Sequence, residues 1–473
     1  MIGNLKPYSA YKDSGVPWLG DVPEHWEVLR LKRVCARSAL YGANVAATSY
    51  TVTGVRFLRT TDITEEGHLN RGGVFLPHES VLDYLLTDGD LLISRSGTVG
   101  RSFLYRAHAH GPCAYAGYLV RFVPGTRVLS RYVFLFTKTL AFAGFLRVMA
   151  ISSTIENVNG EKYANAPLPL PPLPEQVAIV RFLDHEGRRI QRYIRAKRKL
   201  IKLLEEQKQA IIHRAVTRGL NSNVRLKSSG VEWLGDVPEH WEVLRSKYVF
   251  REVDDRSATG EETRLSMSQR FGLVPSCQIE EHRLVSESYA GAKLCKHGDL
   301  VLNRLKAHLG VFALAQEPGL VSPDYTVFRP ARSMEPRYFE ATYHTPACRL
   351  ELRQRAKGIV QGFWRLYTDD FYDIRVPVPP VAEQVAIMAE LDRELAMTNA
   401  ATARTNREID LLREYHTRLI ADVVNGKLDV RELAANLPDI SDEPETLDGT
   451  EALAEGDEPA EGEFDRVPEE AEA

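Results

Sequence analysis

Residues 168–184 read LPLPPLPEQVAIVRFLD, and residues 376–392 read VPVPPVAEQVAIMAELD, 208 positions later. A second block is repeated as well: SGVPWLGDVPEHWEV at 14–28 returns as SGVEWLGDVPEHWEV at 229–243. The stretches that lie between these blocks differ strongly in the two copies. A repeat of about 210 residues is much longer than the roughly 20–50 residues of a solenoid repeat. The sequence therefore predicts two related domains that share a frame and differ in their interiors.

Each proline-rich run predicts the start of a long helix. Proline cannot continue a helix but is tolerated at its first residues, as at Pro174. Apolar side chains then recur at spacings of three, four or seven: Val177, Val180, Leu183, Ile190, Ile194, Ile201, Leu204, Ile211 and Ala215, and in the second copy Val385, Met388, Leu391, Ile409, Leu412, Leu419 and Val423, with Thr398 and Thr402 at its centre. A stripe of this kind is typical of a coiled coil. We expect the two helices to pair, antiparallel if a pseudo-two-fold axis relates the repeats; two independent core helices are the alternative.

The sequence predicts an α+β fold in which two globular domains are separated by the two long helices. The boundaries expected from the repeats are 1–166 for the first domain, 167–225 for the first helix, 226–378 for the second domain, 379–428 for the second helix and 429–473 for a disordered acidic tail. Strands are expected at 55–63, 89–97, 102–107 and 118–124, followed by a helix at 130–150. The second domain repeats this order, with strands at 298–305, 310–316 and 325–330 and a helix near 335–356.

The composition excludes several classes of protein. No run of 18 uncharged apolar residues is present, so we expect no transmembrane helix, and the first residues do not form a signal peptide. The five cysteines are scattered, odd in number and without a CxxC pair. This pattern indicates free thiols in a reducing cytoplasm and argues against a zinc site or a disulfide framework.

The charge is unevenly distributed. Residues 429–473 contain 17 acidic side chains and two arginines, which leaves 58 basic and 47 acidic residues in 1–428, a net charge of +11. A basic body indicates a polyanionic partner, although basic residues can also merely solvate helices. The acidic tail either aids solubility or shields the basic body before partners arrive.

No catalytic or metal-binding motif is evident. The stretch SRSGTVGR at 94–101 has two glycines but lacks the lysine and the strand–loop–helix context of a phosphate loop. His108 and His110 have no supporting carboxylate, and no metal-ligand spacing such as HExxH occurs. We therefore predict neither a catalytic residue nor a metal ligand.

Polar side chains instead gather near the predicted strand ends. Arg and Lys bind phosphates and guanine edges, and Asn and Gln can bind adenine, so loops that carry such groups suit DNA reading. The predicted DNA-binding residues are Arg56, Arg59, Thr60, Ser94, Arg95, Ser96, Thr98, Arg101, Asn157, Asn159, Lys162, Ser268, Gln269, Arg270, Asn303, Arg304, Lys306, Arg355, Lys357, Gln361, Trp364 and Arg365. For any single arginine, a solvated surface charge is the simpler interpretation. Arg95 and Arg304 could also be structural partners of Asp90 and Asp299.

The repeated blocks, together with GDLLISRSGTVG at 89–100 and GDLVLNRLKAHLGVF at 298–312, resemble the specificity subunits of type I restriction–modification systems. The resemblance covers residues 11–428. It implies that each globular domain is a target recognition domain that reads one half of an asymmetric, bipartite site in double-stranded DNA. The half-sites are expected about one helical turn, roughly 10 bp, apart centre to centre.

The resemblance also implies partners. The paired helices act as a spacer and dock two methyltransferase subunits, and restriction subunits that drive translocation join them. The residues assigned to helix pairing or partner docking are Glu175, Gln176, Ile190, Ile194, Ile201, Leu204, Glu383, Gln384, Ile409, Leu412 and Leu419. The chain itself is expected to bind no cofactor, since S-adenosylmethionine, ATP and Mg belong to the partner subunits. No membrane partner is expected.

Two other interpretations stay open at this point. The chain could be a coiled-coil scaffold whose globular domains bind proteins, which the basic body disfavours. It could also be a self-contained restriction or methylating enzyme, which the missing motifs disfavour. Salt-dependent DNA binding separates the first alternative from the specificity subunit, and a methylation assay on the chain alone tests the second.

Overall fold

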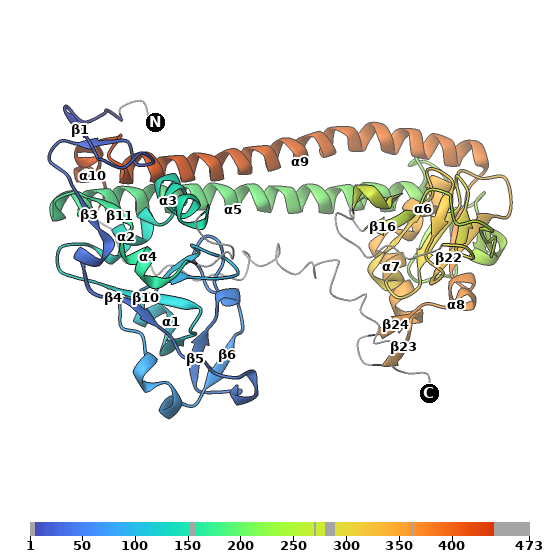
Figure 1. Ribbon diagram of the computed structural model, residues 1–473. Helices are drawn as coiled ribbons and strands as arrows, with labels where there is room; N and C mark the ends of the chain where they lie inside the picture. Colours follow the sequence, from blue (N-terminus) through green and yellow to red (C-terminus); the bar gives the residue numbers. More distant parts are fainter. Residues whose placement is uncertain (1–4, 152–157, 269–270, 280–288, 361–362, 439–473) are drawn as a thin grey trace. The chain divides into compact units, whose positions relative to one another are not determined.

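The computed structural model describes residues 5–151, 158–268, 271–279, 289–360 and 363–438 (Figure 1). The chain divides into two compact units, of which unit 1 comprises Met1–Arg195 and Ile409–Ala473 and unit 2 comprises Ala196–Glu408. Each unit therefore contains one globular domain and a part of each long helix. Asn157, Gln269, Arg270 and Gln361, which were predicted to bind DNA, lie outside the described residues, as does the tail from residue 439 onward.

Unit 1 is built on a four-stranded antiparallel sheet. Its strand order is β4 (Cys35–Tyr41), β10 (Leu119–Pro124), β7 (Leu91–Ser94) and β8 (Ser102–Leu104). A second sheet contains β6 (Val74–Leu76), β5 (Val55–Leu58) and β9 (Cys113–Tyr115), and two ladders pair β1 (Tyr11–Asp13) with β2 (Asp21–Pro23) and β3 (Glu27–Arg30) with β11 (Pro167–Leu170). The globular helices are α1 (Ala107–His110), α2 (Ser130–Phe136), α3 (Leu140–Ile151) and α4 (Gly160–Ala164).

Unit 2 repeats the central sheet in the same strand order. The strands are β15 (Phe250–Val253), β22 (Tyr325–Pro330), β19 (Leu300–Asn303) and β20 (Phe312–Leu314). Two-stranded ladders pair β12 (Leu226–Ser228) with β13 (Asp236–Pro238), β14 (Glu242–Arg245) with β25 (Arg375–Val378), β16 (Leu265–Ser268) with β17 (Gly272–Pro275), β18 (Lys293–Cys295) with β21 (Gly319–Val321), and β23 (Lys357–Val360) with β24 (Phe363–Arg365). The helices are α6 (Pro336–Tyr343), α7 (Pro346–Arg355) and α8 (Thr368–Tyr372). The predicted α+β fold with a shared frame is confirmed.

The single helices predicted at 130–150 and near 335–356 are wrong, because each is broken in two. In unit 1 the break comes at Thr139, whose hydroxyl donates to the Phe136 carbonyl (2.8 Å) and accepts from the Phe142 amide (3.3 Å). In unit 2 Thr345 makes the same pair of bonds to Thr342 and Cys348, and Pro346 begins the next helix. A side chain that caps a new helix competes with continuation of the old one.

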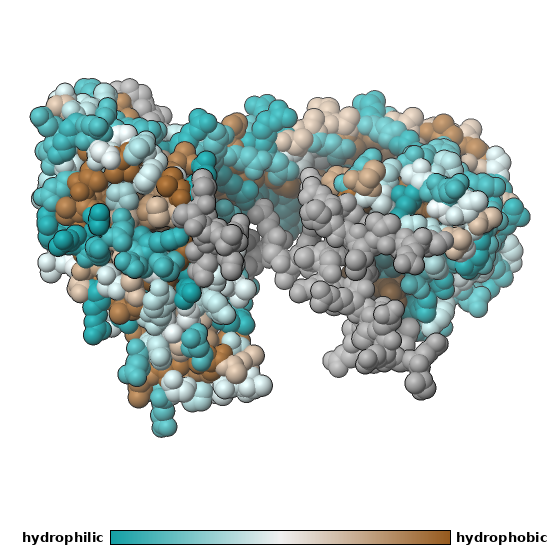
Figure 2. All heavy atoms as spheres, viewed as in Figure 1, coloured by the Kyte–Doolittle hydropathy of each residue, from teal (hydrophilic) through white to brown (hydrophobic). Residues whose placement is uncertain are grey.

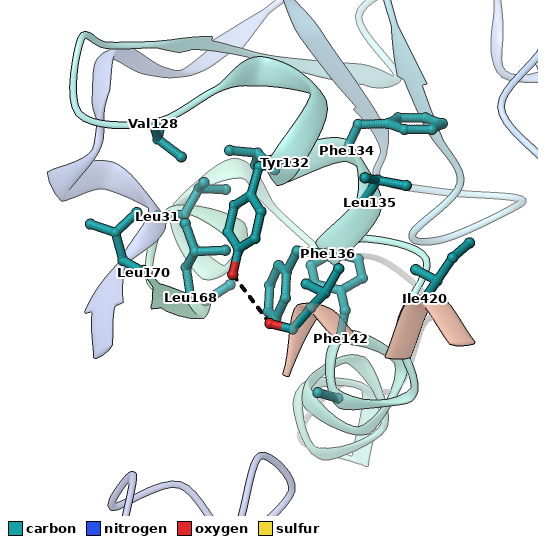
Figure 3. Packing of buried hydrophobic residues seen from close by; sticks show 14 of the residues in the cluster. Leu31, Val128, Tyr132, Phe134, Leu135, Phe136, Phe142, Leu168, Leu170 and Ile420 are labelled. Atoms are coloured by element: carbon teal, nitrogen blue, oxygen red, sulfur yellow. Dashed lines mark hydrogen bonds between the residues drawn. The ribbon is translucent and has the colours of Figure 1, made fainter. Parts of the chain in front are cut away.

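The core of unit 1 gathers the aromatic side chains of the broken helix (Figure 3). Tyr132, Phe136 and Phe142 are at most 3% exposed, and Leu168 and Ile420 belong to the same cluster. The Tyr132 hydroxyl donates to the carbonyls of Pro169 (2.7 Å) and Val424 (3.2 Å). Among the described residues no single helix is long and apolar enough to cross a membrane. Ser130–Phe136 and Leu140–Met149, which are bent by 66° relative to each other, reach that length and composition only together.

The two long helices are α5 (Leu173–Arg218) and α9 (Val381–Val424), of 46 and 44 residues (Figure 1). In unit 1, Gly187 lies beside the imidazole of His416. In unit 2, Lys197 Nζ lies 2.5 Å from Glu408 Oε2. In both units the helices thus lie side by side, and the rising numbers along α5 with the falling numbers along α9 make the pairing antiparallel, as predicted.

The predicted seam residues differ in how deeply they are buried. Ile190, Ile194, Ile409 and Leu419 are at most 5% exposed. Ile201, Leu204 and Leu412 are only half-buried. Thr405 is buried near the centre of α9, where its hydroxyl bonds back to the Ala401 carbonyl at 2.8 Å. The apolar packing is therefore tighter around Ile190 and Ile194 than around Ile201 and Leu204.

The repeated Glu-Gln pair joins each long helix to its own globular domain. Glu175 accepts hydrogen bonds from the indole of Trp26 (3.0 Å) and the hydroxyl of Tyr8 (2.5 Å), and its other oxygen lies 2.8 Å from His25 Nε2. In unit 2, Glu383 Oε2 accepts from the Trp241 indole (3.0 Å) and lies 2.9 Å from His240 Nε2. The two repeated sequence blocks are thus two halves of one contact.

The glutamine beside each glutamate holds the first broken helix. Gln176 accepts from the Leu129 amide (2.9 Å) and donates to the carbonyls of Arg127 and Pro171. Gln384 accepts from the Glu335 amide (2.9 Å) and donates to Pro379. Glu175, Gln176, Glu383 and Gln384 were assigned to helix pairing or partner docking. The structure corrects this assignment: all four bind their own globular domain, and both glutamines are at most 1% exposed.

The C-terminal segment of the described chain belongs to unit 1. The Asp429 amide donates to the Lys6 carbonyl at 2.8 Å, which joins this segment to the N-terminal part of unit 1. Helix α10 (Arg431–Ala435) follows, with Val430 and Ala434 buried in the core of unit 1. Residues 429–438, which were assigned to the acidic tail, are therefore part of the folded unit.

We predict that Glu175→Ala destabilises unit 1 by about 2–3 kcal/mol, because it leaves the buried Trp26 and Tyr8 donors without an acceptor. Glu383→Ala should cost less, since Glu383 is 28% exposed and lacks a partner equivalent to Tyr8. Hydrogen exchange of each unit, with Glu175→Gln as the control that keeps an acceptor oxygen, measures both effects. Equal protection in Glu175→Ala and the wild type would contradict this role.

A second prediction concerns the stability of unit 2 at acidic pH. Burial lowers the pKa of His344 to about 4, and its ring stacks on Phe312 with centroids 4.2 Å apart. Between pH 6.5 and 4 the unfolded chain binds a proton that folded unit 2 does not, so unit 2 loses up to about 3 kcal/mol as the pH falls through this window. Urea unfolding of the wild type and His344→Gln at pH 7 and 4.5 isolates the contribution. Parallel pH profiles of the two proteins would refute it.

Candidate nucleic-acid interface

In unit 1, the end of β7 brings Arg95 to a surface that carries two exposed tyrosines. The Arg95 guanidinium lies 5.2 Å from the ring centroid of Tyr41, which is 43% exposed. The Arg95 amide donates to the carbonyl of Tyr118 (3.0 Å), whose side chain is 61% exposed. We call Tyr41, Arg95 and Tyr118 the unit 1 patch. A cation beside exposed rings suits contact with phosphates and with base or sugar faces.

The start of α4 lies against the same patch. The Tyr41 hydroxyl accepts from the Gly160 amide at 2.8 Å. Asn159 caps α4, because its side-chain oxygen accepts from the Lys162 amide (2.9 Å), and the Lys162 ammonium donates to the Met149 carbonyl (3.3 Å). Asn159 and Lys162 thus lie near the patch, but the side-chain oxygen of Asn159 is already used to cap the helix.

Three other predicted arginines of unit 1 hold the turn that follows β5. Arg56 donates to the Asn70 carbonyl (2.6 Å) and Arg101 to the Ile63 carbonyl (2.8 Å). Arg59 makes two bonds to Asp62, at 3.0 and 2.8 Å, and is 36% exposed. Arg56 and Arg101 are therefore structural. Arg59, next to Thr60 at the start of the turn, keeps an exposed face.

The small hydroxyl residues of the loop after β7 shape it. Ser94 is fully buried and donates to the Thr98 carbonyl, while its own carbonyl accepts from Tyr163 (2.8 Å). The prediction that Ser94 contacts DNA is wrong, because its side chain does not reach the surface. Ser96 and Thr98 are half-buried in the same loop.

The matching surface of unit 2 has different side chains. Arg304 Nε donates to the Asp324 carbonyl (3.1 Å), and the Asp324 carboxylate lies 3.8 Å from the Arg365 guanidinium. Trp364 is 48% exposed on β24. Lys357 is 64% exposed and lies 2.9 Å from Asp370. We call Arg304, Lys357, Trp364 and Arg365 the unit 2 patch; the visible surface of unit 2 is mainly hydrophilic (Figure 2).

The remaining predicted residues of unit 2 have local roles. The Asn303 side chain accepts from the amides of Leu305 (3.1 Å) and Lys306 (3.3 Å), which fixes the turn after β19. Arg355 pairs with Glu351 on α7 (3.1 Å). Ser268 is 6% exposed, so its predicted contact with DNA is wrong.

In each unit an aspartate just before the strand that leads to the patch pairs with an arginine of the neighbouring strand. Asp90 lies 2.6 Å from Arg121, and Asp299 lies 2.9 Å from Arg329. Burial raises the pKa of Asp90, and hydrogen bonding to Asp299 raises the pKa of Arg329. The partners suggested from the sequence, Arg95 and Arg304, are thus wrong, and both arginines remain at the surface loops.

Sequence reasoning missed several residues of these surfaces. Tyr41 and Tyr118 were not selected, although each stands at a strand end. Lys293 was also missed: it is 4% exposed, donates to the Tyr325 carbonyl (2.9 Å), and burial together with the nearby Arg304 lowers its pKa. Within the described part of the chain, no group of three or more His, Cys, Asp or Glu side chains could hold a metal ion.

Comparison with known proteins agrees with this architecture. Residues 23–202 match the family model for the type I restriction modification DNA specificity domain. The chain is 22% identical to the type I restriction enzyme EcoKI specificity subunit of Escherichia coli K12 over 446 residues, which cover 89% of this chain and 93% of that protein. The chain is thus similar to type I restriction–modification specificity subunits over most of its length.

Further relatives extend the match. A putative type I restriction enzyme MjaX specificity subunit of Methanocaldococcus jannaschii is 21% identical and covers 79% of this chain and 87% of its own length. A solved chain from work on complex assembly and conformational transition of the type I R-M system superposes with a TM-score of 0.61 at 17% identity. The match covers 86% of this chain and 99% of the solved chain, so the two share a fold.

We predict that Arg95→Ala weakens specific DNA binding by about 1–3 kcal/mol with little loss of stability, and that Arg304→Ala weakens binding similarly but also removes an exposed hydrogen bond to the Asp324 carbonyl. Arg56→Ala and Arg101→Ala should instead lower stability, because each removes a contact to the backbone of its own domain. Fluorescence anisotropy of labelled DNA and thermal unfolding measure the two effects. Arg127→Ala, which removes an exposed arginine paired with Glu27, is the matched control. The assignment fails if Arg95→Ala and Arg127→Ala bind alike.

Proposed function

We propose that this chain directs a type I restriction–modification complex to its DNA site, with each recognition domain reading one half of an asymmetric bipartite sequence. The observation that carries this proposal is the pair of patches. Arg95 follows β7 in unit 1, and Arg304 follows β19 in unit 2. These two strands hold the same position in their four-stranded sheets. The side chains around that arginine differ between the units, so the two half-sites should differ.

The long helices would act as the spacer and the platform for partners. A helix of 46 residues is about 69 Å long, and pairing stiffens it, so the unread gap would be fixed. Two methyltransferase subunits would dock on this frame, and restriction subunits would join them. A stiff spacer supports half-sites about one helical turn, roughly 10 bp, apart centre to centre.

The chain would contribute recognition and no catalysis. S-adenosylmethionine, ATP and Mg would act on the partner subunits, and the complex would work in the cytoplasm. The residues of this chain would bind and orient DNA, with Arg95 and Arg304 in contact with phosphates or base edges. A scaffold that binds only proteins would gain nothing from two dissimilar patches of arginine and exposed aromatic side chains.

Methylation mapping tests the proposal. Cells that make this chain with its methyltransferase should methylate a bipartite motif with a fixed gap, and cells without this chain should not. Binding of the complex should also weaken steeply with salt, since each phosphate contact adds about −0.9 to the slope of log K against log[salt].

The controls separate the alternatives. The purified chain alone should neither methylate nor cut DNA; if it does, the chain is an enzyme in its own right. If both proteins are made and associate but the methylation pattern does not depend on this chain, the scaffold becomes the better description. Exchange of residues 226–378 with those of a relative should change one half of the motif only.

A further inference from the structure

Trp364 differs from the other four tryptophans of the chain. Trp26 and Trp241 are fully buried, and Trp18 and Trp233 are half-buried parts of the repeated block. Trp364 is 48% exposed and belongs to β24, in a hairpin that Figure 1 draws at the end of the unit 2 domain away from α9. An exposed indole at this place has no counterpart in the repeated frame.

The hairpin displays this ring. Trp364 stands opposite Gly358 in the ladder, and a Cβ on Gly358 would lie 3.8 Å from the indole, so the ring rests over the glycine. An aromatic ring over a cross-strand glycine stabilises a hairpin, which is the simple structural explanation. That explanation requires one face of the ring. It leaves unexplained why nearly half of the largest apolar side chain remains in water.

Two cations occupy the neighbouring pair of the ladder, and their charged groups lie beside the ring of Tyr367. Lys357 and Arg365 are directly opposite each other in the same ladder, one position from Gly358 and Trp364. Tyr367 is 41% exposed, and its ring centroid lies 5.8 Å from Lys357 Nζ and 5.9 Å from the Arg365 guanidinium. Exposed aromatic faces between phosphate-binding cations are the arrangement by which proteins stack on nucleotides.

We propose that Trp364 is the stacking residue of unit 2: its indole packs face-on against a base or deoxyribose of the DNA half-site, while Lys357 and Arg365 hold the flanking phosphates. The inference deepens the proposed function and rests on it. To bind phosphates, Lys357 gives up its ion pair with Asp370, and Arg365 gives up its longer ion pair with Asp324. Lys357 and Asp324 are well exposed, whereas Asp370 and Arg365 are half-buried, so the exchange has a cost that the phosphate contacts must offset.

Unit 1 offers a comparison within the same chain. Its patch places Tyr41 and Tyr118 beside Arg95, so both units combine exposed rings with an arginine although their sequences differ. Both units therefore expose aromatic rings beside an arginine although the residues differ. This indicates that both surfaces need flat apolar faces. Tyr118→Ala therefore serves as the matched substitution in the other unit.

The test uses the complete complex with its methyltransferase and the methylated motif of the wild type. Trp364→Phe keeps a flat ring, Trp364→Leu keeps apolar volume without one, and Trp364→Ala removes both. We expect Trp364→Phe to bind and methylate within about threefold of the wild type, and both other variants to lose about tenfold or more. The Trp364→Leu and Trp364→Ala variants should discriminate less between sequences at the half-site that unit 2 reads. Tyr118→Ala should have this effect at the half-site that unit 1 reads.

Fluorescence supplies a second measurement. Cognate DNA should quench tryptophan emission in the wild type, and this quenching should largely vanish in Trp364→Phe, because the other four tryptophans are in the frame. Hydrogen exchange of residues 357–360 shows whether each variant keeps the hairpin. Wild-type activity of Trp364→Leu, or quenching that persists in Trp364→Phe, would overturn the stacking role. A wild-type complex with no bipartite motif would overturn the proposed function itself.

Discussion

A carboxylate that accepts an indole N–H, buried in unit 1 and half-buried in unit 2, joins each long helix to its globular domain. Glu175 and Glu383 stand in the first turn of a long helix, and Trp26 and Trp241 stand in the first repeated block of each globular domain. A glutamate buried without partners would be costly, so the helix can begin here only where the globular domain supplies donors. The proline-rich strand before each helix pairs with the strand after the tryptophan, which fixes the same junction from the backbone. Rigid junctions of this kind let the loops beyond them vary.

The two units differ in sequence but keep the interactions that their central sheets require. Phe122 and Phe328 occupy the same place in the central sheet, each opposite the first residue of the neighbouring strand. The arginine that pairs with the buried aspartate precedes this phenylalanine in unit 1 (Arg121) and follows it in unit 2 (Arg329). Positions two apart on a strand share a face. The charge pair is therefore retained although its residue moved, because an unpaired buried aspartate would be severely destabilising.

Much of the fold could be predicted from the sequence, because the repeats marked the elements that depend on local pattern. Heptad-like spacing indicated the long helices, and short apolar runs indicated the central strands. The break at Thr139 was not predicted, since a threonine in an apolar run gives no sign that its side chain will cap a new helix. Residues 429–438 were assigned to the tail from their charge. Only the packing of Val430 and Ala434 against unit 1 reveals that they are folded.

The recognition surfaces were harder to predict, because one residue type serves two purposes. Arg56, Arg95 and Arg101 all follow or occupy strands of unit 1, and nothing in their sequence neighbourhoods separates them. In the fold, Arg56 and Arg101 bind backbone carbonyls across the domain, whereas Arg95 lies over an exposed tyrosine. The distinguishing feature is the exposed aromatic ring beside the guanidinium, which places Arg95 at the surface of its domain. Exposed aromatic side chains at strand ends are therefore better candidates for the proposed DNA-binding surface than arginines alone.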